Sequence, residues 1–176
     1  AELGQWHEWN DKESLDWYLL DNEENQKVHR FFKEANAFYK KEPALWEIDF
    51  SWEGFEWLVP DDNHNNVVVF LRKDKKGRDL MCAVNFSPNT YENYRMGVPA
   101  HRKYTPVFNT DDPAYGGDGF GDTESVPVED IPSHGKEHSA AIKIPAFGAV
   151  FLRGEGTFPK PVKTRIKKQA KELAEK

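Results

Sequence analysis

The residues best suited to chemistry stand near the start of the chain, in the stretch ELGQWHEWN at 2–10. Glu2, Gln5, Trp6 and Trp9 bring together a carboxylate, an amide and two indole rings. This mixture is typical of a polar binding surface lined with aromatic rings, because rings offer flat apolar faces while the amide and the carboxylate form hydrogen bonds. We therefore treat these four residues as a candidate binding site.

A second candidate is the glycine-rich segment GGDGFGD at 116–122. Its spacing matches neither GxxxxGK[ST] nor GxGxxG, and Asp118 and Asp122 would repel a phosphate. The same two carboxylates suit a hard cation such as calcium, but no EF-hand spacing accompanies them. We expect a shaped surface loop, with calcium binding as the alternative.

His134 and His138 are four residues apart in SHGKEH. On a helix this spacing would place both on one face, as in zinc proteases, but Pro132 and Gly135 disfavour a helix and no third ligand is evident. We expect solvated loop histidines, no metal and no cofactor. No GxSxG motif frames a serine, and acidic residues are too abundant for any pair to stand out as catalytic.

Composition narrows the class of protein further. The 176 residues suffice for one domain, or for one domain and a remnant of another, but not for a (β/α)8 barrel of roughly 250 residues. The one cysteine, Cys82, lies in the apolar stretch LMCAV and is expected to be a buried core residue in a reducing compartment. No apolar run is long enough to span a membrane, and no signal peptide is visible, so we expect a cytoplasmic protein.

Charge is distributed unevenly along the chain. Residues 160–176 carry seven Lys or Arg and two Glu, so the other residues hold −11 of charge although the whole chain has only −6. An acidic body does not favour nucleic acid, and no aromatic residues are interleaved with the basic ones. We expect 157–176 to be a solvated tail, helical or disordered, and no nucleic-acid or membrane partner.

Two kinds of periodicity follow the candidate site. From 22 to 41 the spacing predicts one amphipathic helix, with Asn22 as its cap and Pro43 beyond its end. Its apolar stripe comprises Val28, Phe31, Phe32, Ala35, Phe38 and Tyr39. Such a stripe requires a packing partner.

After Pro43 the period changes to two. Seven or eight short strands are expected between 54 and 153, with a hairpin turn at DKKG, 74–77, and little regular structure from 110 to 138. This pattern predicts a mainly β fold, an antiparallel sandwich or barrel preceded by one helix.

The order of the motifs carries a family resemblance. ELGQWHEW is followed by LDW at 15–17, PAL at 43–45 and GFEW at 54–57. Further motifs are NFSP at 85–88, YRMGVP at 94–99, FNTDDPAYGG at 108–117 and IPAFGAVFLR at 144–153. Together they closely resemble the C-terminal part of bacterial 1,4-α-glucan (glycogen) branching enzymes of the α-amylase superfamily. Leu3 departs from the pattern, in which Phe is usual.

The resemblance implies a division of the chain. Residues 1–43 would be the C-terminal remnant of a catalytic (β/α)8 barrel, with 22–41 as its last helix, and 44–156 a C-terminal β-sandwich. In the intact enzyme the helix stripe would pack on the barrel. In this chain we expect the sandwich or a second copy to cover it.

The family's reaction in glycogen biosynthesis resembles retaining glycosidase chemistry turned to transfer, and it forms α-1,6 branches on an α-glucan such as glycogen or amylose. Its catalytic carboxylates come from barrel strands that this chain lacks, which implies no catalytic residue here and an inactive chain. Glu2, Gln5, Trp6 and Trp9 would lie at the rim of the cleft, or else pack the end of the barrel.

A second hypothesis is a carbohydrate-binding β-sandwich module. Trp46, Trp52 or Trp57, if exposed, would form a flat platform on which a glucan stacks. Of the three, Trp57 is expected in the core instead, because it alternates with the polar Glu56.

Overall fold

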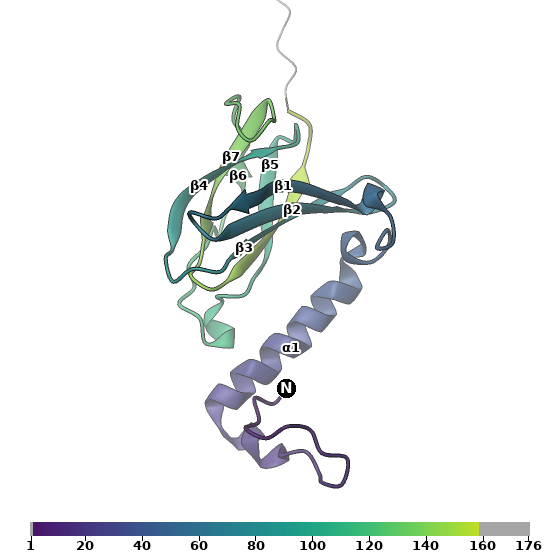
Figure 1. Ribbon diagram of the computed structural model, residues 1–176, viewed down its shortest axis with the longest axis vertical. Coiled ribbons are helices and arrows are strands. Elements are labelled where there is room, and N and C mark those ends of the chain that lie inside the picture. Colours follow the sequence, from purple (N-terminus) through teal and green to yellow (C-terminus); the bar gives the residue numbers. More distant parts are fainter. Residues whose placement is uncertain (1, 159–176) are drawn as a thin grey trace, which may run out of the picture.

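The computed structural model describes residues 2–158, so most of the predicted basic tail lies outside the described residues (Figure 1). Within them, one long helix precedes eight strands. The strands are β1 (Phe55–Asp62), β2 (Val67–Lys73), β3 (Asp79–Asn85), β4 (Tyr91–Val98), β5 (Lys103–Asn109), β6 (Val126–Pro127), β7 (His138–Ile144) and β8 (Ala149–Glu155). None of the described helices is long and apolar enough to cross a bilayer.

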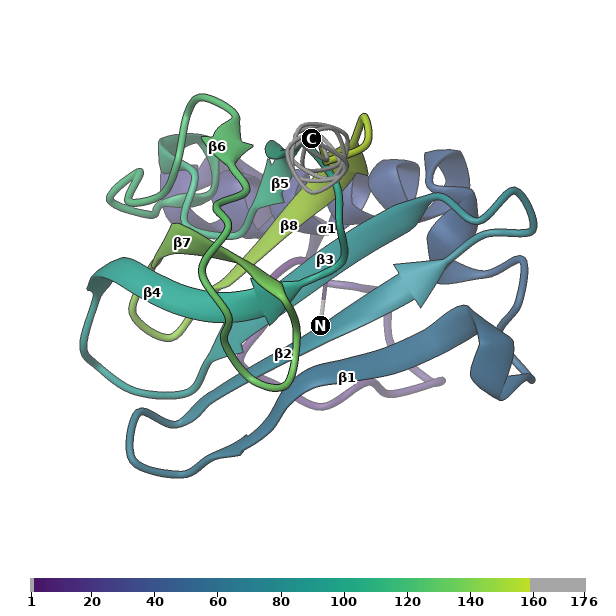
Figure 2. The same cartoon turned by 90° about the horizontal axis from the view of Figure 1, so that it is seen from above.

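The strands form two antiparallel sheets. Six strands lie in the order β1-β2-β3-β8-β5-β6, and β4 pairs with β7 in a second sheet that lies against the first (Figure 2). The predicted turn joins β2 to β3: Gly77 has φ +72°, a conformation open to glycine, and its N–H donates to the Asp74 carbonyl over 2.9 Å. The prediction of a mainly β, antiparallel sandwich preceded by one helix is confirmed.

Helix α1 (Glu23–Lys41) begins and ends where its capping signals predict. The Asn22 side chain accepts a hydrogen bond of 2.9 Å from the Glu24 N–H, which satisfies one of the free donors of the first turn. A 3-10 turn, η1 (Trp17–Asp21), precedes the helix, and η2 (Pro43–Leu45) follows it. Proline at the start of η2 cannot continue the α-helical hydrogen bonding.

The larger sheet is covered on both faces, which β3 demonstrates residue by residue. Met81 and Ala83 point into the main core between the two sheets, whereas Leu80 and Cys82 point to the opposite face. There they pack with Phe38 of α1, with Ala44 of the segment after α1 and with other apolar residues. A strand buried on both faces reads as a continuous apolar run, as LMCAV does.

The sandwich itself covers part of the helix stripe. Phe38 stacks on Phe108 of β5 with ring centroids 5.0 Å apart and meets Phe151 of β8 edge-on at 5.5 Å. Phe31 contacts Phe108 as well, at 6.3 Å. Tyr39, by contrast, is 48% exposed, and no residue of α1 is fully buried. The stripe is therefore shared between the sandwich and solvent.

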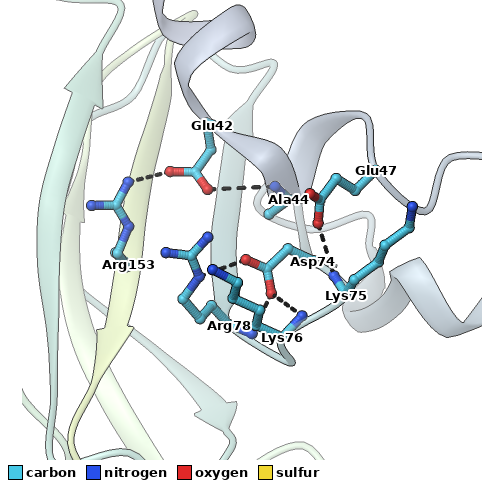
Figure 3. A network of polar contacts seen from close by, with 8 residues as sticks. All are labelled: Glu42, Ala44, Glu47, Asp74, Lys75, Lys76, Arg78 and Arg153. Carbon is cyan, nitrogen blue, oxygen red and sulfur yellow. Dashed lines mark hydrogen bonds and ion pairs between the residues drawn. The ribbon is translucent and has the colours of Figure 1, made fainter.

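Polar contacts fix the junction between α1 and the larger sheet (Figure 3). Glu42, only 4% exposed, accepts from the guanidinium of Arg153 on β8 and from the Ala44 N–H. One turn later, the Glu47 carboxylate accepts from the N–H of Lys75 in the β2–β3 turn, over 3.1 Å. The end of the helix and the sheet are therefore joined by directional bonds as well as by apolar contact.

Candidate functional site

The N-terminal candidate residues lie on the surface beside the start of α1. Their segment is anchored by Leu3, which is buried and whose carbonyl accepts from the Asn25 side chain over 2.7 Å. Trp6 and Trp9 are 91% and 75% exposed.

Glu2 is also exposed, and Gln5 is half-buried with its amide donating to the His7 carbonyl over 3.0 Å. The structure thus presents two free indole rings and a carboxylate to solvent. The likeness to a binding surface remains, but the walls that would enclose a ligand are not supplied by this segment.

A better-formed depression, which we call the aromatic groove, lies beside β1. It has a volume of about 570 Å³ and is lined by Asp49, Phe50, Ser51, Trp52, Phe55, Trp57 and Arg72. Phe50 is fully exposed, Trp52 is 87% exposed and Trp57 is 50% exposed. Several large rings at the surface of one depression are unusual, because such residues are normally buried.

The ring positions in the aromatic groove are set by packing. Phe55 stacks on Phe70 of β2 at 5.3 Å and holds Trp57 edge-on at 4.9 Å. The opposite wall is the 3-10 turn η3 (Trp52–Gly54), capped by the Ser51 side chain, which accepts from the Glu53 N–H.

Arg72, which lines the aromatic groove, holds the segment between α1 and β1 against β2. Its guanidinium donates to the Ala44 and Leu45 carbonyls over 3.3 and 3.2 Å, and to the Asp49 carboxylate over 2.7 Å. Asp49 is the one carboxylate among the described residues that line the groove, and it is paired. Retaining glycosyl transfer needs two carboxyl groups about 5 to 5.5 Å apart, so this groove is equipped for stacking and hydrogen bonding and not for that chemistry.

The prediction for Trp57 was wrong: it lies on the outer surface and not in the core. Trp57 pairs in regular register with Phe70 on the outer face of the larger sheet. It does alternate with Glu56, but Glu56 is the residue on the inner side, where it pairs with Lys73 and Lys136. The irregular pairing between Trp57 and Val59 comes after this position and allows Leu58 and Val59 both to be buried. Trp46 is 42% exposed but does not line the groove.

The segment 116–122 is a shaped loop, as expected. The Asp111 carboxylate closes it by accepting from the N–H groups of Phe120 (2.8 Å) and Asp118 (3.3 Å). Asp122 accepts from the Lys143 N–H of β7 over 2.8 Å, and its burial raises the pKa of its carboxyl group. Asp122 therefore joins the loop to the smaller sheet.

The two histidines have different surroundings. His134 is exposed in a turn, as predicted, with Nδ1 2.9 Å from the Ser133 hydroxyl. His138 is not a solvated loop residue: it opens β7, has a side chain only 15% exposed, and stacks on Phe158 with ring centroids 4.0 Å apart.

Cys82 is buried, as expected, and this burial raises the pKa of its thiol to about 12. Within residues 2–158, no group of three or more His, Cys, Asp or Glu side chains is arranged to hold a metal ion.

Tryptophans were predicted from the sequence as platform residues, whereas the other residues of the groove were not. Phe50, Phe55 and Arg72 are as important to its shape, and Phe70 supports it from below. The density of aromatic residues in FSWEGFEW at 50–57 was the available signal. The contribution of Arg72 comes from a different strand and is visible only after β1 and β2 pair.

Comparison with known proteins assigns the fold to a family. Residues 57–155 match the family described as alpha amylase, C-terminal all-beta domain. Curated relatives include the 1,4-alpha-glucan branching enzymes GlgB of Desulfitobacterium hafniense (42% identical over 88% of this chain), Halothermothrix orenii (39% over 87%) and Rubrobacter xylanophilus (41% over 92%). The aligned regions cover 25%, 24% and 22% of those proteins, so the chain spans about a quarter of the length of the relatives it matches. The match over more than half of its residues, together with the two antiparallel sheets, shows that the chain belongs to the α-amylase C-terminal all-β domain family.

Proposed function

We propose that this chain serves as the C-terminal region of a 1,4-α-glucan branching enzyme that acts on glycogen-like α-glucan in the cytoplasm. The observation that carries the proposal is the 42% identity over 88% of the chain to a protein of that name. Because 88% of the chain is aligned, the similarity includes helix α1 as well as the sandwich, whereas the family match covers 57–155. Accordingly, 1–43 belongs to the catalytic barrel and 44–156 to the sandwich.

In this proposal the chain supplies structure and the barrel supplies the reaction. A carboxylate attacks the anomeric carbon of an α-1,4 linkage while a carboxylic acid protonates the departing oxygen, and a sugar 6-hydroxyl then displaces the enzyme carboxylate. No side chain of this chain has one of those roles. The half-covered stripe of α1, with Tyr39 48% exposed, is the face that would pack on the barrel.

The N-terminal candidates fit the rim of the cleft in this scheme. The bond from Asn25 to the Leu3 carbonyl holds their segment against α1, and Trp6 and Trp9 project from it into solvent. Exposed rings and the side chains of Glu2 and Gln5 would contact glucose units as they enter.

A chimera tests the proposal. In the D. hafniense enzyme, the aligned C-terminal quarter is replaced by this chain, and branching of amylose is followed by the loss of iodine colour at long wavelength. We expect the chimera to branch, and a version that ends before the sandwich to be less active or insoluble. The isolated chain should leave the colour unchanged. A soluble, folded chimera without activity would contradict the proposal, and activity of the isolated chain would contradict its inertness.

The aromatic groove supports a second function, binding of α-glucan by the sandwich itself. Trp52 and Trp57 expose flat faces, and Ser51 and Arg72 stand beside them as hydrogen-bonding groups. Aromatic faces with a few polar neighbours are suited to the apolar faces and hydroxyl groups of sugars.

Affinity gel electrophoresis with glycogen in the gel tests this second function. Trp52→Ala and Trp57→Ala should each abolish most of the retardation. The matched control is Trp17→Ala, because Trp17 is 57% exposed on η1, which precedes α1, whereas the residues that line the groove all follow α1. Equal migration of the wild-type chain in gels with and without glycogen would show that the groove does not bind glucan.

A further inference from the structure

His101, in the connection between β4 and β5, contacts the start of β3 and the residue that follows β8. Its Nε2 lies 2.7 Å from the carboxylate of Asp79, the first residue of β3. Its Nδ1 lies 3.1 Å from the carbonyl of Gly156, directly after the end of β8. The ring therefore ties the start of one strand to the end of another, at the point where the chain leaves the sandwich.

Both partners of the ring are acceptors, which determines its protonation state. A carbonyl and a carboxylate have no hydrogen to donate, so each ring nitrogen must carry one. Only the imidazolium has two N–H groups, because either neutral tautomer would direct a lone pair at one of the two oxygens. Asp79 is 7% exposed, so water does not readily replace the ring as its partner.

The surrounding residues shape a space for this ring. A Cβ at Gly154 would lie 2.5 Å from the His101 Cδ2, so only glycine allows the ring to lie over β8. On the β5 side, Tyr104 meets the ring edge-on at 5.5 Å.

The other charged groups around the ring are accounted for. Glu155 on β8 pairs with Lys103 on β5 over 3.2 Å, and Arg102 is exposed. Among the described residues, Asp79 is the one charged group that forms an ion-pair contact with the His101 ring.

We propose that His101 is a proton-dependent clasp, which in its imidazolium form fastens the exit of the chain at Gly156 to β3 and releases it on deprotonation. Two backbone hydrogen bonds also join residues on either side of Gly156 to the loop that carries His101: the Arg102 N–H donates to the Glu155 carbonyl (3.0 Å), and the Phe158 N–H donates to the Ala100 carbonyl (2.8 Å). Both depend on the position of the loop that carries His101.

The sign of the pH dependence follows from the ring's partners. The hydrogen bond to Asp79 raises the pKa of His101, burial lowers it in part, and the Gly156 carbonyl raises it again, so that the net pKa lies above its ordinary value. A raised folded-state pKa stabilises the clasp fully below the unfolded value of about 6.5, and this stabilisation is lost as the pH rises through the folded-state pKa. Each unit of separation between the two pKa values corresponds to about a tenfold change in the closing equilibrium.

Two measurements on the whole chain test the clasp. Long-range ¹H–¹⁵N correlation spectra should show both His101 ring nitrogens protonated at a pH near 7, where an ordinary histidine is mostly neutral. Hydrogen-exchange protection factors of the Arg102 and Phe158 amides should fall by about tenfold or more as the pH rises from about 6 to 9, while those of the β2–β3 ladder stay constant.

Variants separate the clasp from general loss of stability. His101→Gln should give low protection at both amides that does not vary with pH, whereas His7→Gln, which changes an exposed histidine, should behave like wild type. Asp79→Asn keeps an acceptor but removes the charge, so the fall should move to lower pH. A neutral His101 ring in the wild-type chain at pH 7, or protection that is constant with pH, would overturn the proposal.

Discussion

Asp74 is a buried carboxylate that accepts several hydrogen bonds. It is 2% exposed in the β2–β3 turn, where its carboxylate accepts from the N–H groups of Lys76 (2.9 Å) and Arg78 (2.8 Å) and from the Arg78 guanidinium (2.5 Å). Asp74→Ala should lower the free energy of unfolding by about 2 to 3 kcal/mol, because it leaves these donors unpaired. Urea denaturation measures the change, and Lys76→Ala, which removes an exposed side chain but keeps the same N–H, should cost less than about 0.5 kcal/mol.

The same carboxylate gives a pH test of that prediction. Burial alone would raise the pKa of Asp74, but the hydrogen bonds from Arg78 and Lys76 outweigh it and hold the pKa below its ordinary value. A lowered folded-state pKa stabilises the protein above the unfolded value of about 3.9, and this stabilisation disappears as the pH falls through the folded value. The difference between wild type and Asp74→Ala should thus be full at neutral pH and shrink in acid. If the difference in free energy of unfolding between wild type and Asp74→Ala were the same at neutral and at acidic pH, the role assigned to the charge of Asp74 would be contradicted.

Residue roles that depend on local chemistry were predictable, and those that depend on register were not. The Asn22 cap and the Gly77 turn follow from side-chain type and backbone freedom alone. The outward position of Trp57 depends on which face of β1 is covered by the second sheet, and the alternation within β1 does not reveal that choice. His138 was mistaken for a loop residue because the strand it opens is defined by its partner, β4.

At the scale of elements, the attachment of α1 rests on a few aromatic contacts. Phe38→Ala should destabilise the chain by about 2 kcal/mol, less than for a fully buried Phe, because the ring is only half-buried against Phe108 and Phe151. Tyr39→Ala, the adjacent and exposed position, should change the stability by less than about 0.5 kcal/mol. Amide exchange along α1 reports the effect locally, and unchanged protection in Phe38→Ala would mean that the helix is held in another way.

The segment between α1 and β1 depends on Arg72. Lysine at this position keeps the charge but cannot form the forked contacts to Ala44, Leu45 and Asp49 at once. We expect Arg72→Lys to cost about 1 to 2 kcal/mol in urea denaturation and to weaken retardation in glycogen gels, because one wall of the aromatic groove is no longer fixed. Lys75→Arg, an exchange at an exposed position of the turn after β2, is the control. Retardation equal to wild type in Arg72→Lys would show that the wall is set by other contacts.

The existence, type and approximate bounds of the elements were predictable, because amphipathic periods and caps are local. The faces that meet were not. The apolar stripe of α1 predicted that the helix packs against another surface. The surface itself was not predictable, because the contact of Phe38 with Phe108 and Phe151 joins residues far apart in the sequence. The aromatic groove is of the same kind, since it requires the segment at 49–52 to fold back beside β1 and β2.

For the whole molecule, the layered structure separates two cores of unequal size. The larger core lies between the two sheets and is built entirely from residues of the sandwich. The smaller core lies between the larger sheet and α1 with the segment that follows α1. The larger core should therefore form without α1. The smaller contributes stability only when α1 and the segment after it are in place.

Deletion of residues 1–41 tests this separation. We expect the shortened chain to retain its β-sheet circular dichroism and to unfold cooperatively, but to be less stable by about 3 kcal/mol, because the half-buried apolar contacts of α1 are lost. It should also bind a hydrophobic dye, since Phe108 and Phe151 become exposed on the face that α1 covers in the whole chain. Adding Phe108→Thr and Phe151→Thr to the shortened chain should reduce dye binding again, which distinguishes an uncovered face from partial unfolding. Loss of the β-sheet signal on deletion would show instead that the helix is required for the sandwich to fold.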